Sequence, residues 1–290
     1  MKNVITKTTN PPRNTLIGAH VSAAGGYTNA LKRLKKINGS CLQLFSGSPR
    51  IWKSADISEA QITEFRETKN RLKIDPVYFH ASYLVNFAAN GRIGEMSKAA
   101  LINELILAKN LGVKGSIIHL GSFKGEKPDY DILISNIQNV LENTPKETLF
   151  IIENAGNKKI CCNLSELWYI VEKLNSKRVK VCLDTCHLWA AGYDLSTENK
   201  FDKYFSEFEQ KIGLEKLEII QINDSKDLLG SYRDRHQNLG EGNIPLEEFR
   251  LFMTKPQTKN LPMILEVPGF KKEGPDKRNV DILKRLSDKN

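Results

Sequence analysis

The sequence lacks any long hydrophobic run. No stretch approaches the roughly 18 apolar residues that a membrane-spanning helix needs. The first residues, MKNVITKTTNPPRNT, also lack the apolar segment and the small-residue cleavage site of a secretory signal. We therefore expect residues 1–15 to be a flexible polar tail, residues 16–290 to form one domain, and the protein to work away from membranes.

Cysteine is scarce as well, with five residues in 290. An odd number without regular spacing argues against a disulfide framework. Cys182 and Cys186 flank Asp184, a spacing that could suggest thiolate ligation, but Cys182 lies in an apolar run and is better interpreted as a small core residue. This usage of cysteine favours a reducing, cytoplasmic compartment.

A G-x-G-x-x-G motif is missing after the first apolar run, which disfavours a dinucleotide-binding fold. What is present is a regular alternation of two kinds of segment. Eight short apolar runs are predicted as strands, at residues 16–22, 40–47, 74–82, 115–121, 149–156, 179–187, 217–224 and 261–269. Helical periodicity is found between most of them, at residues 27–36, 59–72, 98–111, 132–141, 163–174, 202–212 and 246–254. The alternation predicts an α/β protein with a closed (β/α)8 TIM barrel as its single domain.

Metal-binding residue types follow the predicted strands. The strand at 179–187 runs through apolar residues into Asp184, and His187 comes three residues later. An ionised carboxylate at the edge of a core needs a partner, usually a cation or a metal. Asp and His are ligands that zinc, manganese and iron accept. The alternative is an aspartate that caps the next helix beside a packed histidine.

The same pattern recurs around the predicted barrel. All five histidines and four carboxylates stand at or just beyond the strand ends, namely His20, His80, His119, His187, His236, Glu153, Asp184, Asp234 and Glu266. In a TIM barrel these ends converge on one face, where active sites are built. A single strand histidine is more often a packed core residue than a ligand. Four carboxylates together would repel one another without a cation, however, so the sequence predicts a multinuclear metal site.

Eight longer motifs carry a resemblance to a known family. They are GAHVSAAGG at 18–26, FSGSPRIW at 45–52, HASYLVN at 80–86, IIHLGS at 117–122, IIEN at 151–154, CLDTCHLWAAGYD at 182–194, DRHQNLGEG at 234–242 and LEVP at 265–268. In this order they resemble the endonuclease IV family of apurinic/apyrimidinic endonucleases, within the xylose isomerase-like TIM barrels. The resemblance spans about residues 16 to 270 and implies the same barrel fold.

The resemblance also implies a site for three divalent metal ions, zinc in the family. Carried over by position, the first ion is held by His80, His119 and Glu153, the second by Glu153, Asp184, Gln221 and Glu266, and the third by His187, Asp234 and His236. Glu153 bridges the first two ions and is the implied catalytic residue. Three further residues are expected to orient the ligands or a water from behind, namely His20, Asn154 and Asn223.

One ligand position departs from the family pattern. The seventh strand of the family ends H-(I/L)-N-D, whereas residues 221–224 read QIND, so Gln221 stands in place of a histidine. An amide oxygen is a weaker zinc ligand than imidazole. We therefore expect the second metal to be held less tightly, to be replaced by a harder ion such as manganese, or to complete its shell with water.

The implied activity is DNA repair. The family hydrolyses the phosphodiester bond 5′ to an abasic site in double-stranded DNA, which leaves a 3′-hydroxyl and a 5′-deoxyribose phosphate. Arg50, Tyr83 and Leu84 resemble the residues that fill the gap left when the abasic nucleotide turns out of the duplex. Without the resemblance they are a surface arginine and a part-buried Tyr–Leu pair.

Basic residues on later loops are candidates for phosphate contacts, namely Lys124, Lys158, Lys226, Arg233 and Arg235. The net charge of +9 agrees with a nucleic-acid substrate. The family resemblance suggests a monomer.

Two other functions are consistent with parts of the pattern. A sugar isomerase or epimerase of the same superfamily also places His, Glu and Asp around divalent metals at strand ends, but it has no need of a basic inserting loop. A non-enzymatic protein that binds damaged DNA is the third interpretation, because Gln221 could mark a lost catalytic metal.

Overall fold

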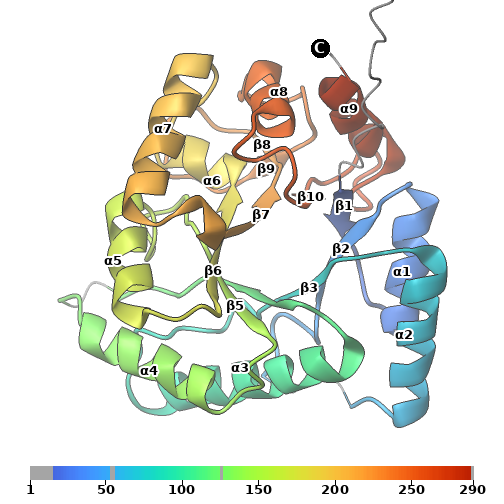
Figure 1. Ribbon diagram of the computed structural model, residues 1–290, viewed down its shortest axis with the longest axis vertical. Helices are drawn as coiled ribbons and strands as arrows, with labels where there is room; N and C mark the ends of the chain where they lie inside the picture. The colour runs from blue at the N-terminus through green and yellow to red at the C-terminus, as the bar shows by residue number, and fades with distance from the viewer. Residues whose placement is uncertain (1–15, 53–55, 125–126, 289–290) are drawn as a thin grey trace, which may run out of the picture.

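The computed structural model describes residues 16–52, 56–124 and 127–288, so the predicted tail at 1–15 lies outside the described residues. Eight parallel strands close into a barrel in the order β1-β10-β7-β6-β5-β4-β3-β2. Helices surround the barrel on its outside (Figure 1). The predicted (β/α)8 TIM barrel is therefore confirmed, while the boundary of the domain at residue 16 stays a prediction.

The elements have the following bounds. The barrel strands are β1 (Ile17–His20), β2 (Cys41–Phe45), β3 (Val77–His80), β4 (Gly115–Ile118), β5 (Leu149–Glu153), β6 (Val179–Asp184), β7 (Leu217–Gln221) and β10 (Met263–Leu265). The helices are α1 (Tyr27–Lys36), α2 (Glu59–Leu72), α3 (Gly91–Leu111), α4 (Tyr130–Glu142), α5 (Leu164–Leu174), α6 (Thr185–Ala190), α7 (Glu198–Lys211), α8 (Leu246–Thr254), α9 (Lys277–Asp288) and the short 3-10 helix η1 (Leu214–Lys216). A small antiparallel hairpin pairs β8 (Asp224–Ser225) with β9 (His236–Gln237).

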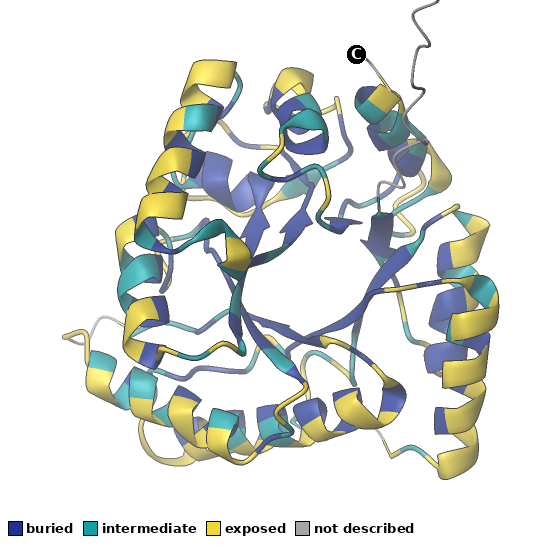
Figure 2. Ribbon diagram, in the orientation of Figure 1, coloured by how far each residue is buried: buried dark blue, intermediate teal, exposed yellow. Residues whose placement is uncertain are grey.

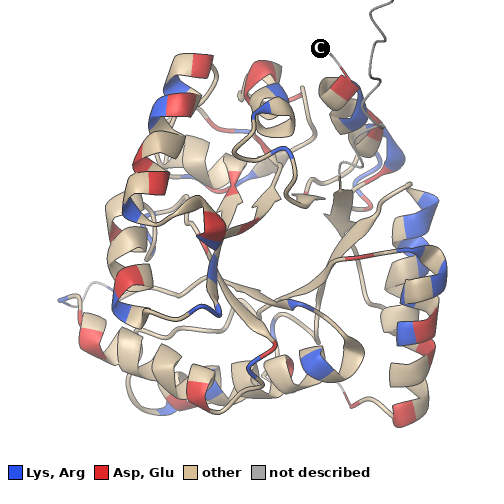
Figure 3. Cartoon of the chain, viewed as in Figure 1, with Lys and Arg blue, Asp and Glu red and all other residues tan. Residues whose placement is uncertain are grey.

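Several helices begin at a residue whose side chain caps the first turn. Before α2, the Ser58 hydroxyl accepts the backbone N–H of Gln61, and the Gln61 side chain accepts the N–H of Ser58, which satisfies two otherwise unpaired donors. Asn163 and Thr197 cap α5 and α7 with one such bond each. The strands are buried and the outer faces of the helices are exposed (Figure 2). Residues of both charges are scattered over these outer helices (Figure 3).

Two neighbouring layers of side chains inside the barrel position the site. The layer nearer the amino ends of the strands, called here the apolar layer, is made of Cys41, Tyr78, Ile117, Ile151, Cys182, Ile219 and Ile264. Side chains two positions apart on a strand share a face. The next interior layer, called here the polar layer, is therefore His20, Gln43, His80, His119, Glu153, Asp184, Gln221 and Glu266. Every strand adds one polar group to this layer.

Strand β1 contributes Gly18 to the apolar layer, and only glycine fits there. A Cβ atom at Gly18 would lie 1.7 Å from the backbone oxygen of Cys41 on the neighbouring strand. Such a distance is far below van der Waals contact, so β1 and β2 could not pair with a larger residue at this position. The close approach of these two strands brings His20 next to Gln43.

Several element boundaries differ from the prediction. Helix α3 starts at Gly91, seven residues before the predicted 98, because its first turn carries glycines that the periodicity does not detect. The predicted strand at 179–187 ends at Asp184, where the separate short helix α6 begins. The hairpin of β8 and β9 was not predicted, since two-residue strands leave no periodic signal. Within the described ranges, no helix has both the length and the apolar character needed to cross a bilayer.

Candidate metal centre

The polar layer opens into a cavity of about 430 Å³ at the carboxyl ends of the strands. Its lining contains side chains from both the barrel and the loops above it, namely His20, Phe45, His80, Tyr83, His119, His187, Asp234, His236, Glu266, Val267, Gly274 and Pro275. All five histidines of the chain therefore face one cavity. This is the face on which TIM barrels build their active sites.

One group of ligand types lies around Glu153 at the end of β5. His80 Nε2 is 3.0 Å from Glu153 Oε2, and His119 Nε2 is 3.4 Å from Glu153 Oε1. His80 Nδ1 donates to the carbonyl oxygen of Ala81 at 2.9 Å. Because a carbonyl oxygen only accepts, Nδ1 carries a proton and Nε2 is the nitrogen turned to the site. The structure thus brings together the three residues assigned to the first metal.

A second group is formed by His187 from α6 and by Asp234 and His236 from the β8–β9 hairpin. Asp234 Oδ1 is 3.1 Å from His187 Nε2 and 3.3 Å from His236 Nε2. Both imidazoles again place Nδ1 against backbone oxygens, those of Asn154 at 3.0 Å and Glu266 at 3.3 Å. The residues assigned to the third metal therefore come together with their Nε2 atoms facing one carboxylate.

The residues assigned to the second metal are arranged less simply. Asp184 groups with Glu153 and His187, with all three ligand atoms within 4.8 Å of one another. Glu266 turns its Oε1 atom to other partners, because Gln221 Nε2 donates to it at 3.2 Å and Gln43 Nε2 also donates to it. The histidine position of the family thus holds an amide that hydrogen-bonds to an adjacent carboxylate.

The three residues expected behind the ligands all contact them. Asn154 Oδ1 accepts the backbone N–H of Asp184 at 2.7 Å, and Asn223 Nδ2 donates to Asp184 Oδ2 at 2.6 Å. Asn223 Oδ1 also accepts the backbone N–H of Glu266 at 2.7 Å. His20 Nδ1 lies 3.2 Å from Glu266 Oε1. These bonds fix two carboxylates that are far apart in the chain.

Asp184 has a structural role as well as a place in the site. Its Oδ1 atom accepts the backbone N–H of His187 at 3.0 Å and so caps helix α6. The helix-cap interpretation of Asp184 is therefore correct, and it is compatible with metal binding because Oδ2 faces His236 at 3.6 Å.

Several buried side-chain atoms of the site have no hydrogen-bond partner among the described residues, and this indicates whether the site fits a metal. Glu153 Oε1, His187 Nε2 and His236 Nε2 are buried and have no hydrogen-bond partner in the described part of the chain. Leaving such an atom unsatisfied costs about 1–3 kcal/mol. Imidazole nitrogens and carboxylate oxygens are the ligands that zinc prefers, so divalent cations would satisfy these atoms. The donor set fits a metal centre.

Two of the imidazoles, those of His80 and His236, have a raised pKa. Burial lowers the pKa of His80, but its contact with Glu153 and the charge of Glu266 outweigh burial and raise the pKa to about 9. His236 behaves alike, since burial is outweighed by Asp184 and Asp234 and its pKa rises to about 9. In the metal-free protein these groups carry protons where a cation would bind, so metal binding releases protons.

The pKa values of His119, Glu153 and Asp184 are also shifted. Burial lowers the pKa of His119 to about 4, which leaves it as the neutral imidazole that binds metal. Burial raises the pKa of Glu153, but the surrounding imidazoles of His119, His187 and His80 lower it well below its ordinary value. Burial raises the pKa of Asp184, and the nearby charge of Glu153 adds to this.

The predicted inserting residues lie on two adjacent loops. Arg50 and Tyr83 are exposed, Tyr83 by 64%, and Leu84 is half-buried. The backbone N–H of Tyr83 and the hydroxyl of Ser82 both donate to the carbonyl oxygen of Pro49, at 3.1 and 2.7 Å. The two loops are therefore joined directly beside the site.

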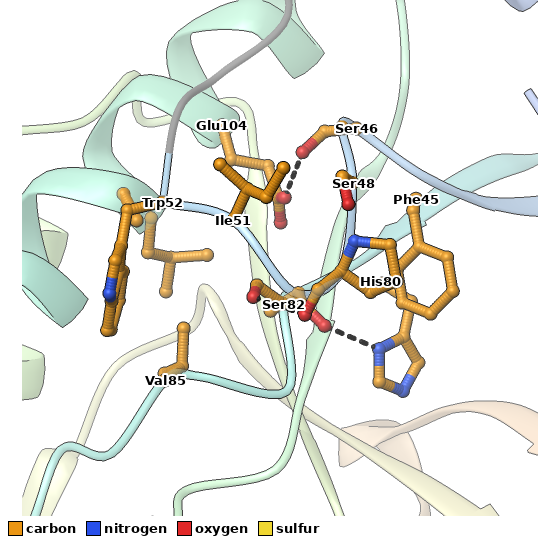
Figure 4. A pocket seen from close by; sticks show the side chains of 14 residues that line it. Phe45, Ser46, Ser48, Ile51, Trp52, His80, Ser82, Val85 and Glu104 are labelled. Atoms are coloured by element: carbon orange, nitrogen blue, oxygen red, sulfur yellow. Dashed lines mark hydrogen bonds between the residues drawn. The ribbon is translucent and has the colours of Figure 1, made fainter.

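A small cavity of about 30 Å³ lies beneath these loops (Figure 4). Glu104 from α3 reaches into it and accepts hydrogen bonds from the hydroxyls of Ser46 and Ser116. Burial raises the pKa of Glu104. Because Ser46 begins the loop that carries Arg50, Glu104 anchors this loop to the helix behind it.

Among the basic loop residues, one forms an ion pair within the protein and two line a cavity that is open to solvent. Arg235 binds Asp227 through two hydrogen bonds of 2.8 and 2.5 Å, which braces the hairpin that carries Asp234. Lys124 and Lys158 line an open cavity of about 650 Å³. The ammonium of Lys158 lies 4.7 Å from the ring centre of Tyr232, at the edge of the same cavity.

One residue near the site was not predicted, and a second, Cys186, was considered only through its spacing from Cys182. Gln43 belongs to the polar layer and contacts both His20 and Glu266. A polar residue within the apolar run at 40–47 was the available signal. Cys186 lies within 4.8 Å of ligand atoms of Asp184 and His236. Burial raises the pKa of Cys186 to about 12, so its thiol is neutral.

Comparison with known proteins places the chain in a family. The family model described as xylose isomerase-like TIM barrel matches residues 31–286. A protein named probable endonuclease 4 from a Sulfurihydrogenibium species is 34% identical, over 93% of this chain and 98% of that protein. Endonuclease IV from Thermus thermophilus superposes with a TM-score of 0.82 and 30% identity, covering 93% of this chain and 98% of that one.

A D-tagatose 3-epimerase-like protein also superposes, with a TM-score of 0.68, covering 93% of this chain and 96% of that one. Its sequence identity is 18%, so this likeness concerns the barrel fold alone. The sequence resemblance agrees with the long, near-complete matches to the endonucleases, and the chain belongs to the endonuclease IV family of the xylose isomerase-like TIM barrels.

Proposed function

We propose that this protein is a DNA repair endonuclease that hydrolyses the phosphodiester bond 5′ to an abasic site. The observation that carries the proposal is the buried cluster of imidazoles and carboxylates around Glu153, in a chain that belongs to the endonuclease IV family. The products are a 3′-hydroxyl and a 5′-deoxyribose phosphate. The substrate is double-stranded DNA, and the protein acts as a monomer.

The site would hold three divalent ions, with zinc at the positions rich in imidazole. The proposed ligands are His80, His119 and Glu153 for the first ion, Glu153, Asp184, Gln221 and Glu266 for the second, and His187, Asp234 and His236 for the third. Bound divalent ions lower the pKa of water and neutralise charge on a phosphate during in-line displacement.

Glu153 has the central position among the protein groups. Its two oxygens face different neighbours, Oε2 towards His80 and Oε1 towards His119 and His187. Glu153 would therefore help to hold the divalent ions, which would supply an activated water for attack at phosphorus. Asn154 and Asn223 fix Asp184 at the end of the neighbouring strand β6, so the reacting groups need little rearrangement.

The loop residues would open the duplex. A missing base removes stacking and pairing at the lesion, so the abasic nucleotide turns out at little cost. Tyr83 and Arg50 offer an exposed aromatic ring and a planar guanidinium that can fill the gap and stack on neighbouring bases. Leu84 supports them, and Lys124 and Lys158 would contact phosphates farther along the strand.

The test is to identify the ends that the protein produces. A duplex with one abasic site, labelled at the 5′ end of the damaged strand, is incubated with the protein, and the product is offered to a DNA polymerase. Hydrolysis 5′ to the lesion gives a fragment that the polymerase extends directly. A fragment that cannot be extended would indicate cleavage 3′ to the lesion and contradict the proposal. Binding without any cleavage would favour the non-enzymatic binder.

A further inference from the structure

Two glutamine side chains face each other inside the polar layer. Gln43 lies on β2 and Gln221 on β7, and both side chains are fully buried. Gln221 Nε2 donates to Gln43 Oε1 at 3.1 Å. Neither residue type is needed to fill space in a barrel, where branched apolar side chains are usual. Packing alone therefore does not explain why two glutamines lie here.

Glu266 determines which way the two amides face. Its Oε1 atom accepts from Gln221 Nε2 at 3.2 Å and from Gln43 Nε2. Turning the Gln221 amide over would place its oxygen against Glu266 Oε1 and against Gln43 Oε1, which are both acceptors. Gln43 thus fixes the orientation of Gln221, and the two amides together occupy one oxygen of Glu266.

This orientation leaves the oxygen of Gln221 free. Gln221 Oε1 is buried and has no hydrogen-bond partner among the residues that the structure describes. Gln221 is paired in register with Asp184 on β6, and the strand on its other side, β10, leads into Glu266. The unsatisfied Oε1 atom of Gln221 therefore lies on the strand between those that lead to Asp184 and Glu266.

We infer that the Gln43–Gln221 pair builds a middle cation position made only of oxygen, from Glu153, Asp184, Glu266 Oε2 and Gln221 Oε1. The position takes an oxygen-preferring divalent ion, Mn²⁺ or Mg²⁺, in place of zinc. Gln43 is a positioning residue there, since it acts through Gln221 and Glu266. The inference rests on the proposed metal site and assigns one of its ions and a role for Gln43.

The contrast with the flanking groups supports the assignment. His80 and His119 supply two imidazoles on one side, and His187 and His236 supply two on the other. Imidazole suits zinc, whereas carboxylate and carbonyl oxygens suit Mg²⁺ and Mn²⁺. Zinc generally binds more tightly than Mn²⁺ to the same ligands. We therefore expect the preference for zinc over Mn²⁺ to be smaller at the middle position than at the two positions rich in imidazole.

The test is a count of the metals that the full chain retains. Metal-free protein is loaded with zinc in the presence of excess Mn²⁺, desalted and analysed by mass spectrometry for both metals. We expect two zinc ions and one Mn²⁺ per chain, and a pulsed EPR spectrum of the bound Mn²⁺ without strong coupling to imidazole nitrogen. Three zinc ions with no Mn²⁺, or strong imidazole coupling, would overturn the inference.

Variants separate the contributions of the two amides. Gln221→His is expected to retain a third zinc under the same conditions. Gln43→Met is expected to weaken the middle ion by about 10- to 100-fold and to leave two zinc ions bound. Gln257→Met is the matched control, because Gln257 also has a buried, unpartnered amide oxygen but lies outside the site, and its metal content should equal that of the unchanged protein.

The failure of this inference is distinguishable from that of the proposed function. Three equivalent zinc ions together with incision of abasic DNA would overturn only the middle-ion assignment. Protein that retains no metal of either kind would contradict both the assignment and the proposed metal-dependent activity.

Discussion

The two layers of the barrel interior are built from the same strands, yet they have opposite character. In the apolar layer, Ile117, Ile151 and Ile264 belong to one buried cluster and have no solvent exposure. Two residues further along the same strands stand His119, Glu153 and Glu266. A step of one side-chain repeat, about 6–7 Å along a strand, separates a dry core from a charged site.

The difference separates stability from function. The apolar layer gains free energy from burial and close packing, and its replacement would create cavities. The polar layer contains unpartnered buried atoms and closely spaced charges, which oppose folding unless cations bind. Substitutions in one layer should therefore change the stability of the fold, and substitutions in the other should change chemistry.

The largest effect is expected from Glu153→Gln in the polar layer. The amide keeps the shape of the side chain but loses the charge shared among the surrounding imidazoles. Incision of abasic DNA should fall by roughly 10²–10⁴-fold, measured as kcat/KM, with an unchanged circular dichroism spectrum. Glu142→Gln, at an exposed position on α4, should leave the rate unaltered. Full activity in Glu153→Gln would remove Glu153 from the mechanism.

Ile151→Ala tests the apolar layer directly below Glu153. Loss of the buried side chain should lower the free energy of unfolding by about 2–5 kcal/mol in urea denaturation. The rate constant kcat measured well below the melting temperature should stay within a few fold of the original. A large loss of kcat with little change in stability would show that the two layers are not separable in this way.

Asn223→Ala tests a positioning role within the polar layer. The substitution removes the bonds to Asp184 and to the backbone of Glu266, which hold two proposed ligands in position. Metal affinity, measured by competition with a chelating dye, should fall about 10- to 100-fold. If metal affinity is unchanged and only stability drops, Asn223 is a packing residue and not a positioning one.

The smallest effect is expected for Tyr83→Ala, above both layers. The side chain is mostly exposed, so stability should change little. Loss of stacking should weaken binding to an abasic duplex by about 1–3 kcal/mol in fluorescence anisotropy, with a smaller effect on an intact duplex. Equal weakening on both duplexes would assign Tyr83 to general DNA contact and not to insertion at the lesion.

The barrel could be predicted from the sequence because its signals are local and repeated. Eight apolar runs separated by helical periodicity leave few other architectures for this length. The positions of Glu153 and Asp184 followed from the same logic, since parallel strands end at one face. Helix α6 and the β8–β9 hairpin were missed, because they are too short to carry a period.

Contacts between polar side chains of different strands could not be predicted from the sequence. Gln43 and Gln221 are 178 residues apart, and no property of either segment indicates that their amides meet. The double role of Asp184, as a helix cap and as a group facing His236, also depends on geometry that appears only when the barrel closes. The proposed ligand assignments came from the family motifs and stay predictions until metals are measured.

The most direct measurement is incision of an abasic duplex by the purified protein, by the chelated protein and by the chelated protein resupplied with zinc or Mn²⁺, with metal content determined in each sample. We expect that chelation abolishes incision, that added metal restores it, and that Glu153→Gln is not restored. Incision at full rate by protein verified to be metal-free would contradict the assignment of the polar layer as a catalytic metal centre.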